Sequence, residues 1–111
     1  MKLQPIIYTG NTEAAVEWYG HVIGSKPTIE SDMWTAFDVG GATLGVHRVE
    51  NSPQRGRVEL SLVTAEPLEA VVLRLADHGI QPARGIADET FGRSIVLEDP
   101  DGTPVQVNEH H

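Results

Sequence analysis

A set of polar side chains could meet on one face of a small β-sheet. Strand-like patterns span residues 3–8, 42–49, 57–63 and 103–108, and successive side chains of a strand point to opposite faces. If the apolar side chains at every second position of these strands face the helices, the opposite face of the sheet carries hydrogen-bonding groups, a carboxylate and an imidazole. Concave faces with a few convergent polar groups commonly hold small molecules, so the pattern indicates noncovalent ligand binding. The residues on this face are Gln4, Ile6, Tyr8, Gly45, His47, Arg57, Glu59, Ser61, Gln106 and Asn108.

The same alternation has a second interpretation. An antiparallel sheet that is covered by helices on one side often turns a solvated polar face to water on the other. On periodicity alone, these residues fit an exposed sheet face as well as a binding surface.

Two amphipathic helices must hold such a sheet. Each shows apolar residues at i, i+3, i+4, i+7 and i+8, and the two stripes superpose with a shift of 53 residues. Asn11 or Thr12 is expected to cap the first helix, with Gly24 at its end. We assign Trp18 and Tyr19 to the core because they lie on the first stripe. The stripes are Ala15, Trp18, Tyr19, Val22 and Ile23, and Leu68, Val71, Val72, Leu75 and Ala76.

The strands repeat as the helices do. One strand precedes each helix, at Leu3–Tyr8 and Arg57–Val63, and further strands follow each. The chain therefore predicts a β-α-β-β-β unit twice, in modules of about residues 1–52 and 53–111 of a single domain, with a polar hinge at Asn51–Gly56. A ferredoxin-like sheet has two helices but needs only four strands. The strands expected after the helices are Lys26–Glu30, Trp34–Val39, Ala42–Val49, Gln81–Gly85, Arg93–Glu98 and Thr103–Asn108.

Composition excludes several functions. The 111 residues carry a formal net charge of −8, so no basic stripe is available for nucleic acid or an anionic membrane surface. The chain has no cysteine, which excludes disulfides, thiolate metal sites and a cysteine nucleophile. No apolar stretch is long enough for a membrane span and no signal-peptide core follows Met1, so we expect a cytoplasmic protein.

Two motifs resemble those of the vicinal oxygen chelate superfamily, which includes glyoxalase I, extradiol dioxygenases and bleomycin-resistance proteins. The first runs from Phe91-Gly92-Arg93-Ser94 to the turn Asp99-Pro100-Asp101-Gly102, and the second is Ala15-Val16-Glu17-Trp18-Tyr19 with Val22-Ile23-Gly24. The resemblance implies an α+β fold of two β-α-β-β-β modules. These would form curved mixed sheets with helices on the outer face, completed as half-barrel cavities in a homodimer.

The resemblance also implies where a metal would lie in metal-using members. One ligand comes from the first strand of each module and one from the last, which here gives Gln4, Gly45 or His47, Glu59 and Gln106; the usual carboxylate position falls on Gly45, and His47 is the nearby substitute. Gln106 stands where the family usually has a glutamate, and divalent metals favour imidazole and carboxylate ligands. We therefore expect no metal cofactor, or else one Ni, Zn, Fe or Mn ion. His47 could equally be a partly buried histidine bonded to the backbone.

Three functions fit this interpretation. The favoured one is metal-free binding or sequestration of a small molecule by the ligand-binding residues Trp34, Tyr8, Ser61, Asn108 and Phe91. The alternative is a metal-dependent lyase, isomerase or dioxygenase that acts on vicinal oxygens, with Glu59 as metal ligand or catalytic base. A module that serves only for association is the third. Asp99 and Asp101 are explained by the turn, and Asp88-Glu89 is expected on an exposed loop.

Overall fold

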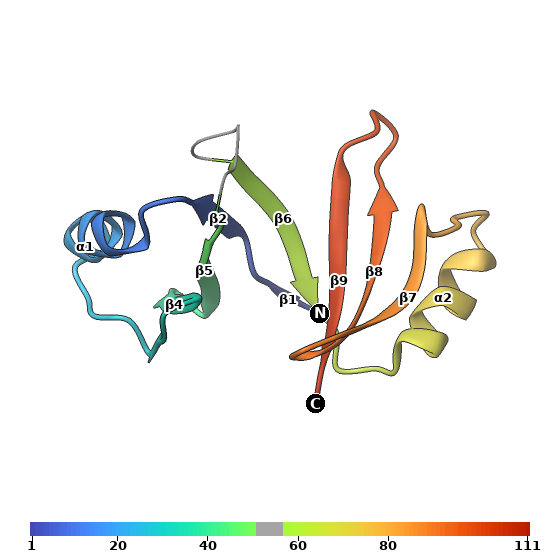
Figure 1. The fold of residues 1–111 in the computed structure, drawn as a ribbon. Coiled ribbons are helices and arrows are strands. Elements are labelled where there is room, and N and C mark those ends of the chain that lie inside the picture. Colours follow the sequence, from blue (N-terminus) through green and yellow to red (C-terminus); the bar gives the residue numbers. More distant parts are fainter. Residues whose placement is uncertain (51–56) are drawn as a thin grey trace. The chain divides into compact units, whose positions relative to one another are not determined.

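A computed structural model describes residues 1–50 and 57–111 (Figure 1). The chain forms two compact units, which we call the N-terminal unit (Gln4–Glu59) and the C-terminal unit (Met1–Leu3 with Leu60–His111). The predicted hinge at Asn51–Gly56, with the module boundary near residue 52, lies outside the described residues. Within the described residues, no helix has both the length and the apolar character to cross a bilayer.

The N-terminal unit is one mixed sheet with one helix. Its elements are β2 (Ile6–Thr9), α1 (Thr12–Ile23), β3 (Ile29–Glu30), β4 (Trp34–Val39), β5 (Ala42–Arg48) and the first part of β6 (Arg57–Val63). The strand order is β3-β4-β5-β2-β6. Strand β2 runs parallel to β5, and the other pairs are antiparallel.

The C-terminal unit repeats this arrangement. It contains the rest of β6, α2 (Leu68–Ala76), β7 (Arg84–Glu89), β8 (Gly92–Glu98) and β9 (Pro104–His110), in the order β6-β9-β8-β7. Strand β6 is parallel to β9, as β2 is to β5, and the short β1 (Lys2–Leu3) pairs with β6. The predicted α+β fold with a doubled β-α-β-β-β pattern is therefore confirmed, and the ferredoxin-like alternative is wrong.

The first and seventh strands differ from their predicted positions. The segment Leu3–Tyr8 is divided into β1 and β2 at Gln4-Pro5, because proline has no N–H to give to a sheet ladder. Strand β7 begins at Arg84 and ends at Glu89, so Asp88 and Glu89 belong to a strand and not to the expected loop.

The helix-facing pattern of β6 is only partly correct. Leu62 is half-buried, but Val58 and Leu60 are exposed, and so is Leu3 of β1. Ile7, Val46 and Val107 are buried as predicted. Alternation correctly assigns a side chain to a face of the sheet, but it does not show how far the helix covers that face.

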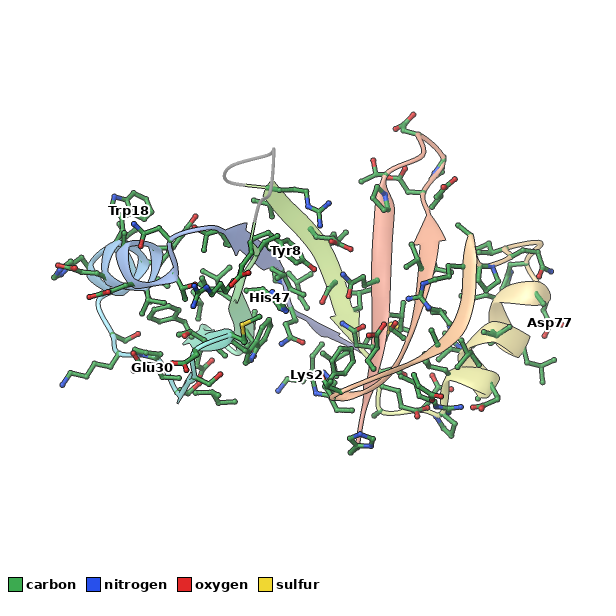
Figure 2. The ribbon with its side chains drawn as sticks, in the orientation of Figure 1. Lys2, Tyr8, Trp18, Glu30, His47 and Asp77 are labelled. Carbon is green, nitrogen blue, oxygen red and sulfur yellow. The ribbon has the colours of Figure 1, made fainter. Side chains whose placement is uncertain are left out.

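Helix α1 has the predicted ends but not the predicted buried stripe. The Asn11 side chain accepts the N–H of Ala14 at 3.1 Å, and Gly24 ends the helix with φ 82°. Trp18 and Val22 are 59% and 64% exposed, so their assignment to the core is wrong, whereas Ala15, Tyr19 and Ile23 of the same stripe are half-buried. Figure 2 shows Trp18 on the outer side of α1.

The sheet-facing side of α1 is rotated away from the predicted stripe. Its half-buried residues include Val16, Gly20 and Ile23, which recur at i, i+4 and i+7. A Cβ atom at Gly20 would lie 3.3 Å from the carbonyl oxygen of Ser25 and 3.7 Å from the Phe37 ring, so this residue faces β4 and the segment that follows the helix. Gly20 therefore lies at the centre of the sheet-facing side of α1, and Trp18 lies on the opposite side of the helix.

Helix α2 forms the core that the sequence predicts. Leu68 and Val71 are fully buried with Ile95 and Val107. Half-buried neighbours complete the cluster, although Ala76, the last residue of the predicted stripe, is exposed. Fully burying a side chain of this size contributes about 1.5–3 kcal/mol, so α2 is held by packing. The neighbours are Leu62, Val72, Leu75 and Leu97.

An arginine and two glutamates join α2 to the last strands. Arg93 of β8 donates hydrogen bonds to the carboxylates of both Glu69 on α2 and Glu109 on β9. Glu109 also accepts the N–H of Leu68 at 2.7 Å, and so caps a helix whose own N-cap residue, Pro67, has no capping side chain. Hydrogen bonds from Arg93 lower the pKa of Glu69 from 4.5 to about 2, and they also lower the pKa of Glu109.

This cluster predicts a defined acid sensitivity. A carboxyl group whose pKa is lowered by folding stabilises the fold above its unfolded pKa and loses that contribution as the pH falls towards its folded pKa. For Glu69 this window runs from about pH 4.5 down to about pH 2. Arg93→Met should therefore lower the free energy of unfolding at pH 7, and the difference from wild type should shrink across this window. Urea denaturation at several pH values measures it, and a difference that is the same at pH 7 and pH 2 would contradict the cluster's role.

Candidate functional site

Four side chains form a row across the face of the N-terminal sheet that is turned away from α1. The register places Trp34 of β4 opposite His47 of β5, His47 opposite Tyr8 of β2, and Tyr8 opposite Arg57 of β6. The ring centroids of Tyr8 and His47 are 5.5 Å apart, and those of Trp34 and His47 are 6.2 Å apart. Figure 2 shows Tyr8 and His47 close together. We call Trp34, His47, Tyr8 and Arg57 the aromatic row.

The row continues from ring to cation. The Arg57 guanidinium lies 4.6 Å from the centre of the Tyr8 ring, a distance at which a cation is attracted to the ring face. Arg57 also pairs with Glu59 at 3.2 Å, and the Glu59 side chain is only 16% exposed. The carboxylate that could serve as a base or a metal ligand is therefore already engaged by a guanidinium.

Gly45 allows Trp34 to take its position. A Cβ atom built at Gly45 would overlap the six-membered ring of the Trp34 indole. The indole therefore lies directly on the backbone of β5, and no other residue type fits there without moving it. The family resemblance implies a metal-ligating residue at or near this position of β5. The Trp34 indole occupies the space that the side chain of such a residue at position 45 would need.

His47 has a defined backbone partner. Its Nδ1 lies 2.8 Å from the carbonyl oxygen of Arg48, so Nδ1 is the nitrogen that donates and Nε2 carries the lone pair of the neutral ring. The side chain is half-buried beside two aromatic rings. His47 is therefore partly buried and bonded to the backbone, as one interpretation of the sequence expects, while its role as a metal ligand stays a prediction.

Gln4 lies at the start of this unit and is 7% exposed. Among the described residues, its Oε1 atom is buried without a hydrogen-bond partner. Burial of an unpaired amide oxygen is unfavourable, so Gln4 is a polar group that a ligand could satisfy.

These residues do not fit a resident metal ion. The indole covers Gly45 and Glu59 pairs with Arg57, whereas the backbone bond of His47 through Nδ1 is compatible with a ligand role for Nε2. Gln106 lies on β9 of the other unit, opposite Ser61 and Val96. In the part of the chain that the structure describes, no three histidine or acidic side chains are grouped as metal ligands. That the protein binds no metal stays a prediction.

The C-terminal sheet has its own polar face, on the side away from α2. Ser61 and Asn108 are both buried, and the Asn108 amide donates to the Ser61 hydroxyl at 3.4 Å. Phe91 lies at the turn between β7 and β8, with its ring 5.3 Å from His110 and 39% of the residue exposed. The structure therefore brings Ser61 and Asn108 together but places Phe91 at the end of the strands.

Sequence reasoning missed three polar residues on this face. Ser94 lies opposite Asn108, and its hydroxyl contacts both Arg84 and Glu89 of β7. The alternation of Ser94 with the buried Ile95 could have placed Ser94 here. Gly85 could have indicated an irregular strand, since glycine inside a strand often marks a bulge.

A separate hollow of about 560 Å³ lies at the beginning of α1. Its lining includes Thr35, which points to the opposite side of β4 from Trp34, so the hollow is not part of the aromatic row. Its carboxylates, from Glu13, Glu17, Glu30 and Asp32, are exposed to solvent. An acidic surface of this kind needs no bound ligand to explain it.

Residues 3–107 match the family model described as Glyoxalase/Bleomycin resistance protein/Dioxygenase superfamily. One relative is the metallothiol transferase FosB of Shouchella clausii (strain KSM-K16), 30% identical over 106 residues, with 88% of this chain and 72% of FosB covered. Another is the phenazine antibiotic resistance protein EhpR of Enterobacter agglomerans, 22% identical, with 92% of this chain and 86% of EhpR covered.

Solved structures share the fold at low sequence identity. A Legionella pneumophila protein described as an NAD-dependent benzaldehyde dehydrogenase has a TM-score of 0.80 at 19% identity, covering 98% of this chain and 99% of its own. A glyoxalase/bleomycin resistance protein/dioxygenase superfamily member from Vibrio splendidus 12B01 has a TM-score of 0.65 at 15% identity, covering 97% of both chains. At these identities the likeness shows the fold alone.

The contact between Gly45 and Trp34 gives a direct prediction. Gly45→Ala should displace the indole and lower the free energy of unfolding by about 1–3 kcal/mol, the usual cost of overpacking. In a Trp18→Phe background, where Trp34 is the one remaining tryptophan, its fluorescence emission should shift to longer wavelength. Gly10→Ala is the matched control, because a Cβ there meets only ordinary van der Waals contact. Unchanged emission in Gly45→Ala would show that the indole does not lie on β5.

Proposed function

The chain belongs to the glyoxalase/bleomycin resistance protein/dioxygenase superfamily, and we propose that it binds a planar aromatic small molecule through the aromatic row, without a resident metal ion. The observation that carries this proposal is the Trp34 indole lying on Gly45. The same contact that fills the place of a ligand side chain supplies a flat apolar surface.

The chemistry of the row favours a planar ligand. Aromatic pairs gain about 0.5–1.5 kcal/mol beyond their buried area when they stack offset or meet edge to face. Trp34 and Tyr8 flank His47, so ring surface extends over three neighbouring strands. Gln4, with its buried and unpartnered amide oxygen, supplies a hydrogen-bond acceptor in the same unit.

Charge favours a cationic ligand over a neutral one. The net charge of −8 attracts cations over a distance set by the ionic strength. The charge of Arg57 is balanced by Glu59 at 3.2 Å, so the row itself does not repel a cation strongly. Similarity to a phenazine antibiotic resistance protein supports a planar, nitrogen-containing class of ligand.

The second candidate is a metal-dependent enzyme in which Glu59 acts as ligand or base. Similarity to the metallothiol transferase FosB, at 30% identity, favours it. This function requires Glu59 to leave Arg57 and the Trp34 indole to move from Gly45. Glu59→Gln would abolish turnover in such an enzyme, but it would leave binding of an uncharged aromatic dye by the aromatic row largely intact and would weaken only the binding of a cationic dye, because Arg57 loses its balancing charge.

Phenazine and N-methylphenazinium test the binding proposal, because the two are alike in shape and differ in charge. In the Trp18→Phe background, both should quench Trp34 fluorescence, and the cation should bind more tightly at low salt, with the difference shrinking as salt is added. Trp34→Ala should weaken both on the order of tenfold, as expected for loss of the principal stacking surface. Binding of Trp34→Ala is followed by equilibrium dialysis, since this variant has lost the reporter ring.

The control variant is Trp18→Phe itself, compared with wild type in the same dialysis experiment. Trp18 is exposed on α1, away from the row, so its replacement should leave dye affinity unchanged. Equal affinity of wild type and Trp34→Ala for both dyes would contradict the proposal.

A further inference from the structure

The hollow at the beginning of α1 contains two hydroxyl groups that its exposed carboxylates do not explain (α1 and β4 are labelled in Figure 1). Thr35 of β4 is 1% exposed and lines the hollow, and its hydroxyl makes no hydrogen bond within the described residues. Thr12, the first residue of α1, also lines the hollow, and its Oγ1 atom is buried without a partner in the described part of the chain. A buried hydroxyl without a hydrogen bond is unfavourable, so a ligand that bonds to these groups recovers a loss.

The sheet register places a carboxylate beside the Thr35 hydroxyl. Glu30 of β3 lies directly opposite Thr35, and two such residues share one face of the sheet, with Cβ atoms about 4.5–5.5 Å apart. This face is turned towards α1, because Phe37, two residues further along β4, faces Gly20 of that helix. Glu30 also lines the hollow. A donor placed between Glu30 and Thr35 could therefore bind to both.

Helix α1 supplies another wall of the hollow. Thr12 and Val16 lie one turn apart on the same side of the helix, and both are half-buried. Glu13 and Glu17 follow them in the sequence and are exposed. Asp32, in the segment between β3 and β4, is an exposed fourth carboxylate of the lining. The hollow thus has hydroxyl groups inside and carboxylates around them.

The charges around the hollow favour a cation. Four of its described lining side chains are acidic and one, Arg48, is basic, and Arg48 lies 3.7 Å from Glu50, which balances its charge. The positive end of the α1 dipole opposes a cation, but Glu13 in the first turn offsets it. The net charge of −8 acts in the same direction as the carboxylates of the hollow.

The arrangement of these carboxylates favours an extended cation over a metal ion. In the ranges 1–50 and 57–111, no three acidic or histidine side chains are grouped as metal ligands. A single exposed ion pair contributes little, so an organic cation that reaches several carboxylates at once gains more than a single charge does. The volume of about 560 Å³ lies within the range of pockets that hold small organic molecules.

We propose that this hollow binds an aliphatic polyamine, with one ammonium group between Thr35 and Glu30 and another beside Thr12 and Glu13. An ammonium nitrogen carries three N–H donors, so it can donate to the Thr35 hydroxyl oxygen and to the Glu30 carboxylate together. The site lies on the opposite face of the sheet from the aromatic row, and it adds a second ligand to the function proposed above.

Spermidine and hexaamminecobalt(III) test this site, because both are trications but only spermidine spreads its charge along a chain. Each is titrated into the ¹⁵N-labelled protein at constant ionic strength, and the backbone amides of Thr12, Glu30 and Thr35 are followed by NMR. Spermidine should shift all three signals in a saturable way, and the compact complex should bind on the order of tenfold more weakly, since it reaches fewer of the carboxylates. Added salt should weaken the binding of spermidine.

Thr35→Val tests the buried hydroxyl, because valine has a similar shape and no hydrogen-bonding group. This variant should bind spermidine on the order of tenfold more weakly, as expected for one lost hydrogen bond to a charged group. Thr43→Val is the matched control, since Thr43 of β5 pairs with Asp38 and is not part of the described lining of the hollow. Its affinity for spermidine should equal that of wild type.

Glu30→Gln and Glu98→Gln separate a local carboxylate from the net charge. Both residues are exposed, and each substitution removes one negative charge, so neither disturbs a buried position. Glu98 lies on β8 of the C-terminal unit. Glu30→Gln should weaken spermidine binding severalfold, whereas Glu98→Gln should leave it nearly unchanged, because salt screens distant charges.

Three results would overturn the proposal. The first is equal affinity for spermidine and hexaamminecobalt(III), which a merely acidic surface predicts. The second is unchanged spermidine binding in Thr35→Val, and the third is equal weakening by Glu30→Gln and Glu98→Gln. Thr35→Val should leave the binding of phenazine to the aromatic row unchanged, so failure of this site and failure of the proposed function are distinguishable.

Discussion

The missing Cβ atom at Gly45 is the constraint on which the candidate site depends. Pairing of β4 with β5 places Trp34 two residue pairs away from Gly45 on the same face of the sheet, and only glycine lets the indole lie on the strand. The aromatic row follows from that placement, because Trp34, His47 and Tyr8 then lie side by side on three strands. In the proposed function, the same contact also occupies the space that a metal-ligating side chain at Gly45 would need. This is why we propose ligand binding in preference to metal chemistry.

The two helices pack against their sheets in different ways. Helix α2 buries Leu68 and Val71 completely and is tied to the last strands by Arg93, whereas α1 has no fully buried residue and keeps Trp18 in solvent. The two β-α-β-β-β repeats thus share a strand order without sharing a core. The sheet faces turned away from the helices also differ: the N-terminal unit carries the aromatic row there, and the C-terminal unit carries hydrogen-bonded polar side chains.

Much of this arrangement can be predicted from the sequence, because the alternation of side chains along a strand and the spacing of apolar residues along a helix are local properties of the chain. Alternation places Tyr8, His47, Arg57 and Glu59 on one face, and the 53-residue repeat predicts the doubled unit. The misassigned residues depend on what lies across the sheet. Trp18 fits a helical stripe as well as Ile23 does, and only the position of β4, whose Phe37 ring faces Gly20, decides which is covered. The sequence predicts a loop at Glu89, where the structure has a strand with a one-residue bulge that cannot be counted from the sequence.

Metal content per chain tests the central claim most directly. The protein is purified without chelator and without an added tag, because histidines at this end of the chain, where His110 and His111 already lie, could hold ions of their own. It is then incubated with nickel, zinc, iron or manganese before mass spectrometry. If Trp34 on Gly45 closes the metal position, wild type should hold far less than one ion per chain with each metal. About one ion per chain, lost in Glu59→Gln, would contradict the account and establish the metal-dependent alternative.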